Sequence, residues 1–181
     1  MSLFLALLVA CSTPLPDGVV VDAQTAPVPF TPEQIAAYNT VGRTWVFRVD
    51  SPQTPSMRRT MRFDEMGEGG AWVQSTVGAW DADSGPDGTP LVDSTRTFST
   101  WSELQHHAAY PADATERAWA KARLPGGTVD CVQYTVDEGD GRVSTACFDP
   151  ERPGPPVVMS QRDGETTQFT MTLQSTSVDS P

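Results

Sequence analysis

The chain has 181 residues, of which 38% are hydrophobic, and its 23 acidic side chains against 12 basic ones give a formal net charge of -11. This length is typical of one globular domain. No apolar run approaches the roughly 20 residues of a membrane-spanning helix, which excludes a polytopic membrane protein. The acidic excess argues against nucleic-acid binding, because phosphate contacts require clustered Lys and Arg.

The N-terminus has the pattern of an export signal. Residues 3–10 (LFLALLVA) are all apolar and are followed directly by Cys11 and a polar, proline-containing stretch. An apolar run of this length matches the hydrophobic core of a secretory signal peptide and is too short for a membrane span. Residues 8–11 (LVAC) resemble the lipobox of bacterial lipoproteins.

The resemblance to bacterial lipoproteins has three implications. Residues 1–10 would be removed as a signal peptide, Cys11 would carry acyl chains, and Ser12 in place of Asp would direct the protein to the outer membrane. Acyl chains hold a protein on a bilayer without a spanning helix, because each buried methylene contributes about 0.8 kcal/mol. The lipid bilayer is therefore the expected partner. The alternative is an uncleaved apolar N-terminus that packs into the core.

Proline residues mark the next segment as a spacer. Residues 11–30 contain four of them, Pro14, Pro16, Pro27 and Pro29, and proline-rich segments are extended. We expect a tether over residues 11–30 that holds the domain away from the membrane, or alternatively an edge strand at Val19–Val21. One globular domain is expected over residues 31–175, followed by a disordered tail over residues 176–181.

Capping signals predict two short helices. Thr31 followed by Pro32 and Gln34 forms a capping box, which predicts a helix that ends near Asn39. Thr100 and Glu103 repeat the pattern ahead of a second helix over residues 101–109.

The rest of the domain has the period of two that is typical of strands. We expect one antiparallel, curved sheet of about seven or eight strands in meander order, a mainly β (α+β) fold with one or two short helices packed on one face. Residues 71–80 (AWVQSTVGAW) are apolar on both faces, which predicts a central strand covered on both sides. Residues 114–124 fit a helix or a strand, and their alternating alanines favour the strand. The other expected strands are 43–50, 57–63, 91–98, 128–136, 142–148, 157–162 and 165–173, the last two joined by an Asp163-Gly164 turn.

Two cysteines lie in one predicted hairpin. Folding residues 131–147 symmetrically about Gly139 places Cys131 directly opposite Cys147 and Gln133 opposite Thr145. Directly opposed Cβ atoms come close to disulfide range, so we expect a cross-strand disulfide. A register shifted by one residue would instead leave two buried free thiols. Two cysteines with distant histidines do not indicate a zinc site.

The sequence contains no motif that predicts catalysis or a cofactor, and we expect neither. His106 and His107 are adjacent, a spacing unlike that of a metal pair on a helix, and His107 is expected to be partly buried and structural. The acidic loop 81–88 lacks the glutamate of a calcium loop and is interpreted as a solvated turn. The three arginines Arg58, Arg59 and Arg62 form a basic cluster that is interpreted as the solvent face of a strand; the alternative is a surface that meets an anionic headgroup or an acidic partner.

Two functions remain open. The lipobox and the meander together resemble lipoproteins of the half-barrel kind, such as the lipoprotein carriers of the Gram-negative periplasm. The favoured hypothesis is a non-enzymatic envelope module with an unknown protein partner. The alternative is a carrier that binds an apolar ligand or lipid between the sheet and its helix, lined by Trp45, Phe47, Trp72, Trp80, Phe169 and Met171.

Overall fold

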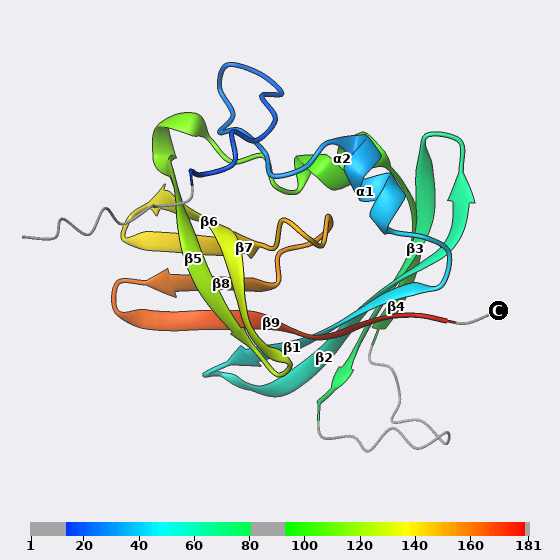
Figure 1. Cartoon of the computed structure of the whole chain (residues 1–181). Helices are drawn as coiled ribbons and strands as arrows, with labels where there is room; N and C mark the ends of the chain where they lie inside the picture. Colours follow the sequence, from blue (N-terminus) through cyan, green and yellow to red (C-terminus); the bar gives the residue numbers. More distant parts are fainter. Residues whose placement is uncertain (1–13, 81–92, 180–181) are drawn as a thin grey trace, which may run out of the picture.

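The computed structural model describes residues 14–80 and 93–179. These residues form one open, curved antiparallel sheet with two short helices, α1 (Pro32–Tyr38) and α2 (Trp101–His106), above one of its faces (Figure 1). A 3-10 turn, η1 (Ala112–Ala114), follows α2. The nine strands are β1 (Arg43–Ser51), β2 (Thr54–Gly67), β3 (Gly70–Ala79), β4 (Asp93–Thr100), β5 (Thr115–Leu124), β6 (Gly127–Gly139), β7 (Arg142–Phe148), β8 (Val158–Asp163) and β9 (Thr166–Val178).

The topology is a meander with one long crossing. The strand order is β4-β3-β2-β1-β9-β8-β7-β6-β5, so the chain starts in the middle of the sheet and moves outward to β4. Helix α2 then carries it to the opposite edge, from which β5 to β9 return inward until β9 pairs with β1. The mainly β prediction is confirmed, with nine strands, and the ambiguous residues 115–124 are a strand.

Both predicted helices are present, with the predicted caps. Thr31 and Gln34 exchange the two hydrogen bonds of a capping box, and Thr100 and Glu103 do the same. Because a capping box satisfies backbone donors that a helix start leaves free, each short helix has a fixed first residue. The helices lie side by side above the sheet (Figure 1).

The predicted hairpin registers are wrong in both cases. In the β6–β7 hairpin the turn residues are Asp140 and Gly141, both with positive φ (52° and 82°), and Gln133 lies opposite Cys147. The expected pairing about Gly139 overlooked this Asp-Gly turn and the register shift between Asp137 and Gly139.

In the β8–β9 hairpin, Asp163 pairs with Thr166, so the turn residues are Gly164 and Glu165. The predicted Asp163-Gly164 turn is therefore displaced by one residue. A second shift between Gln161 and Arg162 then sets Val158 opposite Thr172.

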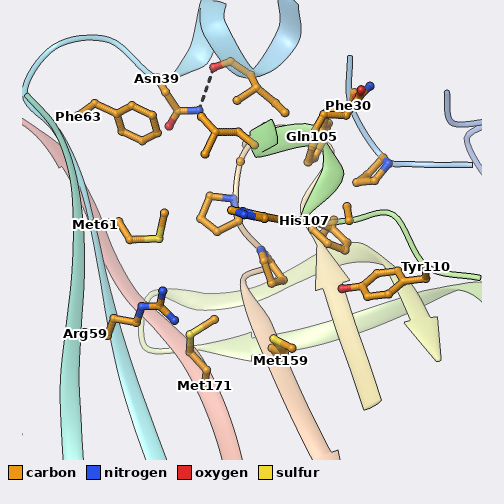
Figure 2. A pocket seen from close by; sticks show the side chains of 18 residues that line it. Phe30, Asn39, Arg59, Met61, Phe63, Gln105, His107, Tyr110, Met159 and Met171 are labelled. Carbon is orange, nitrogen blue, oxygen red and sulfur yellow. Dashed lines mark hydrogen bonds between the residues drawn. The ribbon is translucent and has the colours of Figure 1, made fainter. Parts of the chain in front are cut away.

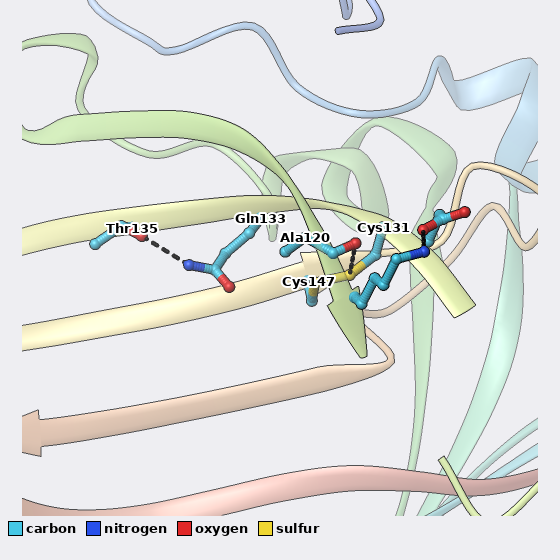
Figure 3. Close-up of a disulfide and its surroundings, with 7 residues drawn as sticks. Ala120, Cys131, Gln133, Thr135 and Cys147 are labelled. Carbon is cyan, nitrogen blue, oxygen red and sulfur yellow. Dashed lines mark hydrogen bonds and ion pairs between the residues drawn. A yellow bond between two sulfur atoms is a disulfide. The ribbon is translucent and has the colours of Figure 1, made fainter. Parts of the chain in front are cut away.

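The predicted disulfide is present, although the two cysteines are diagonal neighbours. Cys131 of β6 and Cys147 of β7 are bonded with their Cα atoms 5.6 Å apart (Figure 3). Relative to the predicted register, the pairing is shifted by two residues, since Gln133 and not Cys131 lies opposite Cys147. A shift by an even number keeps both cysteine side chains on the same face. The bond closes a loop of 16 residues, which stabilises the fold by about 3 kcal/mol in the chain-entropy model.

The core consists of two clusters. The first is built around Trp45 and Phe47, and the second around Phe30, Tyr134 and Phe148. Neighbouring residues of β6 and β7 point to opposite faces and join different clusters. Cys131 and Cys147 belong to the first, and Val132, Tyr134, Ala146 and Phe148 belong to the second.

The strand covered on both faces is thus β6, where β3 was predicted. Strand β3 is second from an edge and buries one face through Ala71 and Val73. On its other face Trp72 is half-buried and packs against Phe98 of β4 with the Arg96 guanidinium over its ring. Trp72 therefore covers the outside of the sheet.

Residues 14–30 pack against the domain, although a tether over residues 11–30 that stands away from it was predicted. Val28 and Phe30 are buried in the second core cluster, and Val28 forms an antiparallel bridge with Val19. The Tyr134 hydroxyl donates to the carbonyl of Pro27 (2.6 Å). These residues pack on the domain because they alternate between prolines and core side chains. Residues 176–178 of the predicted tail likewise belong to β9, which pairs with β1 as far as Val178.

Candidate functional site

A pocket lies where the two core clusters meet. Its volume is about 370 Å³, within the range of small-molecule sites. Phe63 and Met171 belong to the first cluster, and Ile35 and Phe148 belong to the second. The pocket is the space that remains between the sheet and the helices that cover it (Figure 2).

The sheet wall of the pocket is rich in methionine. Met61 projects from β2, and Met159 of β8 lies directly opposite Met171 of β9. Figure 2 shows these three side chains on the sheet side of the pocket. Methionine adapts its shape to the molecule it contacts, so this wall tolerates apolar ligands of differing outline.

The helix wall is held in place by two buried amides. The Gln105 side chain of α2 donates from Nε2 to the carbonyl of Phe30, which precedes α1 (2.9 Å). Asn39, fully buried at the end of α1, accepts a hydrogen bond from Trp45 Nε1 (2.9 Å) through its Oδ1. Its Nδ2 donates to the carbonyls of Ile35 and Pro153, at 2.9 Å each.

Asn39 thereby connects three parts of the chain, namely α1, β1 and the loop between β7 and β8. That loop supplies Gly154, Pro155 and Pro156 to the pocket wall. A Cβ atom at Gly154 would lie 2.7 Å from Cζ2 of the buried Trp45 ring, so only glycine lets the loop approach this closely.

Three polar side chains face the pocket besides the two amides. Arg59 of β2 and His107 at the end of α2 are exposed, and Tyr110 is half-buried. Burial raises the pKa of the Tyr110 phenol to about 12, so the hydroxyl stays protonated at neutral pH. Figure 2 shows Arg59 approaching from the sheet side and His107 from the helix side.

One of the six predicted lining residues contacts the pocket. Met171 lines it, whereas Trp45 and Phe47 are fully buried core residues. Trp80 lies beneath the guanidinium groups of Arg48 and Arg58. Trp72 covers the outside of the sheet, as described above, and the half-buried Phe169 is absent from the lining.

The position of Arg59 in the pocket lining could have been predicted from the sequence. In a strand, alternate residues share a face, so Arg59 belongs with Met61 and Phe63 and not with Arg58 and Arg62. The prediction that all three arginines form one solvent face overlooked this alternation. Arg62 instead pairs with Asp64 and Asp179, at 3.2 and 2.9 Å.

Two other predictions concern single features. His107 is exposed, where a partly buried side chain was expected. The acidic loop 81–88 lies outside the described residues. Over residues 14–80 and 93–179 no group of acidic, histidine or cysteine side chains could hold a metal ion. The helices found there are too short and too polar to cross a membrane.

Comparison with known proteins assigns no family. No protein-family model and no curated protein matches the chain. Thirteen solved chains match it, among them the crystal structure of a DUF1329 family protein from Desulfovibrio piger. That protein is 8% identical over 82% of this chain and 90% of its own, with a TM-score of 0.31. Values this low carry no functional argument.

Replacing Asn39 tests whether this one side chain fixes the pocket walls. The Asn39→Ala variant should lose about 3 kcal/mol of unfolding free energy, because the buried Trp45 indole N–H and the partly buried Pro153 carbonyl both lose their partner. Urea unfolding followed by tryptophan fluorescence measures this. The neighbouring, exposed Thr40→Ala is the control and should change stability by less than about 0.5 kcal/mol. Equal stability of both variants would contradict the assignment.

Proposed function

We propose that this protein is a lipoprotein, anchored to the outer membrane through Cys11, that binds an apolar ligand in the pocket between its sheet and its helices. The observation that carries the binding function is the pocket itself. A solid core would favour a purely structural module, whereas a space of about 370 Å³ remains here between apolar walls. Small-molecule sites in proteins are typically pockets of this size with mostly apolar linings and a few polar groups.

The pocket walls supply the affinity that such a ligand needs. Phe30, Ile35, Phe63 and Phe148 are buried in the lining. Each methylene that moves from water into such surroundings contributes about 0.8 kcal/mol. The sheet wall adds the three adaptable methionines described above.

The anchor would hold the domain close to the bilayer. The described chain begins at Pro14, whose carbonyl accepts a hydrogen bond from Trp119 Nε1 of β5 (3.1 Å). Arg117 of the same strand donates to the carbonyls of Pro16 (2.8 Å) and Asp17 (3.1 Å). Cys11 is three residues from Pro14, which spans at most about 11 Å. The β5 edge is therefore the part of the domain nearest the membrane in this proposal.

Trp119 supports this orientation. Its side chain is 37% exposed although it is large and apolar, and tryptophan is enriched where proteins meet the lipid headgroups. Its hydrogen bond to Pro14 supports the proposal, because Pro14 is the described residue nearest in sequence to Cys11.

The anchor is tested by replacing the acylated residue. The Cys11→Ser variant should move from the membrane pellet to the soluble fraction after cell lysis, because serine carries no diacylglycerol thioether. Immunoblotting of both fractions measures the change. Ser12→Ala retains the cysteine and should stay with the membranes. If Cys11→Ser remains in the pellet, the lipid anchor is not what holds the protein there.

Ligand binding is tested by filling the pocket. Met159→Trp inserts a larger side chain into the sheet wall, and we expect it to weaken binding of the neutral dye N-phenyl-1-naphthylamine at least tenfold, about 1.4 kcal/mol. Fluorescence titration measures the dissociation constants. Val178→Trp adds the same residue at an exposed position outside the lining and should bind like the wild type. If the wild type does not bind the dye, the hypothesis of a structural module without a ligand is the better one.

A further inference from the structure

We infer that the ligand of this pocket is a single-chain amphiphile with an anionic headgroup, whose chain occupies the apolar interior and whose head is bound at the mouth by Arg59. The inference rests on the proposed binding function and adds the chemical class of the ligand. It is carried by the distribution of charge and burial over the lining residues.

The charge of the lining is opposite to the charge of the chain. Asp and Glu make up 23 of the 181 residues, yet none of the 18 described residues that line the pocket is acidic. The two ionisable nitrogen bases in the lining are Arg59 and His107. In a protein with a net charge of -11, an anion has few places to approach without repulsion from carboxylates, and this mouth is one of them.

Arg59 has no carboxylate partner within the described residues. Several other cationic side chains do have one within 4.0 Å, namely Arg48, Arg62, Arg96, Lys121 and Arg152. The Arg59 guanidinium can therefore donate its fork of N–H groups to a bound carboxylate or phosphate in the geometry that both anions prefer.

Two further donors lie on the opposite wall. His107 carries at least one ring N–H in either protonation state. The Tyr110 hydroxyl, a neutral phenol, makes no hydrogen bond among those found in the described residues and points toward the pocket in Figure 2. A headgroup at the mouth would thus meet donors from both the sheet and the helix side.

Burial increases from the mouth to the interior in the order that an amphiphile requires. Arg59 and His107 are exposed, whereas Phe63 is 2% and Ile35 is 4% exposed. Both polar side-chain atoms of the buried Asn39, Nδ2 and Oδ1, already form hydrogen bonds within the protein. The Gln105 Nε2 likewise donates a hydrogen bond to the Phe30 carbonyl. The interior accordingly offers a chain mainly apolar contacts.

The pocket volume limits the ligand to one chain. At roughly 30 Å³ per methylene-sized group, the share of one water molecule in the liquid, about 370 Å³ holds on the order of a dozen such groups. This is the size of one medium-length acyl chain and is too small for a lipid with two long chains.

The experiment compares ligands that share a ten-carbon chain and differ in the head. Isothermal titration below the micelle concentration should give wild-type affinities at least about tenfold higher for decanoate or decyl phosphate than for 1-decanol, since a charge-assisted hydrogen bond contributes about 1.5–3 kcal/mol. Decyltrimethylammonium should bind more weakly than 1-decanol. The tighter of the two anions identifies a carboxylate or a phosphate source.

Substitution at Arg59 assigns the preference to that side chain. Arg59→Gln should bind both anions about tenfold more weakly and 1-decanol as well as the wild type does, and Arg59→Lys should recover part of the anion affinity. Arg123→Gln removes the same charge from an exposed position of β5 outside the lining and should bind like the wild type.

The outcomes separate this inference from the proposed function. Equal affinities for the anions and 1-decanol, or an Arg59→Gln variant that keeps the anion preference, would overturn the inference while apolar binding stands. A loss of 1-decanol binding in Arg59→Gln equal to the loss of anion binding would also overturn it. No binding of any ten-carbon ligand to the wild type would refute the proposed function itself.

Discussion

The side chain of Asn39 sets the distance between the helices and the sheet. Its three hydrogen bonds of 2.9 Å are a buried one to the Ile35 carbonyl of α1, a buried one to Trp45 on β1 and a partly buried one to the Pro153 carbonyl. A buried amide whose partners are all satisfied stabilises one geometry, because any other arrangement leaves a polar atom unpaired. Helix α1 has only seven residues and could not hold its position by its own helical stability. The pocket lies between this helix, which Asn39 holds in place, and the sheet.

The path of the chain explains why a space remains at this place. The sheet is built in two halves, β1 to β4 and β5 to β9, which the segment with α2 connects over one face. The first core cluster draws on both halves, through Trp45 and Phe47 of β1 and Leu173 of β9, whereas the strand residues of the second cluster come from β6 and β7. The N-terminal segment closes the second cluster through Val28 and Phe30. The pocket lies beneath the two helices and is lined by residues of both clusters, such as Phe63 of the first and Phe148 of the second.

The elements that could be predicted from the sequence are those decided by local chemistry. The capping boxes at Thr31 and Thr100 depend on residues three positions apart, and both are present. The hairpin registers failed because a single added residue moves every pair beyond it, as the Asp140-Gly141 turn and the shift near Glu138 did for β6 and β7. The disulfide was predictable because it requires only that Cys131 and Cys147 lie on the same face of the sheet. A register shift by an even number of residues leaves both side chains on that face.

The lining of the candidate site was harder to predict, because a large aromatic side chain can either contact a ligand or fill the core, and its size does not distinguish the two. Trp45 and Phe47 have the size of ligand-binding residues but fill the core, and their neighbours in space come from strands distant in sequence. The pocket instead uses smaller or more flexible side chains, such as Met159 and the Pro155-Pro156 pair, which no local pattern marks. Arg59 was the exception, since strand alternation alone places it with Met61 and Phe63.

The central claim is that the space beneath the two helices is a binding site and is occupied when the protein is in its own membrane. Native mass spectrometry of the full-length protein, extracted from its host in a mild detergent, tests this most directly. We expect a population that is heavier than the acylated chain by the mass of one single-chain anion, and this mass should be released on unfolding. A protein that carries its covalent acyl groups and nothing else, in repeated extractions, would show that the pocket is empty in the membrane.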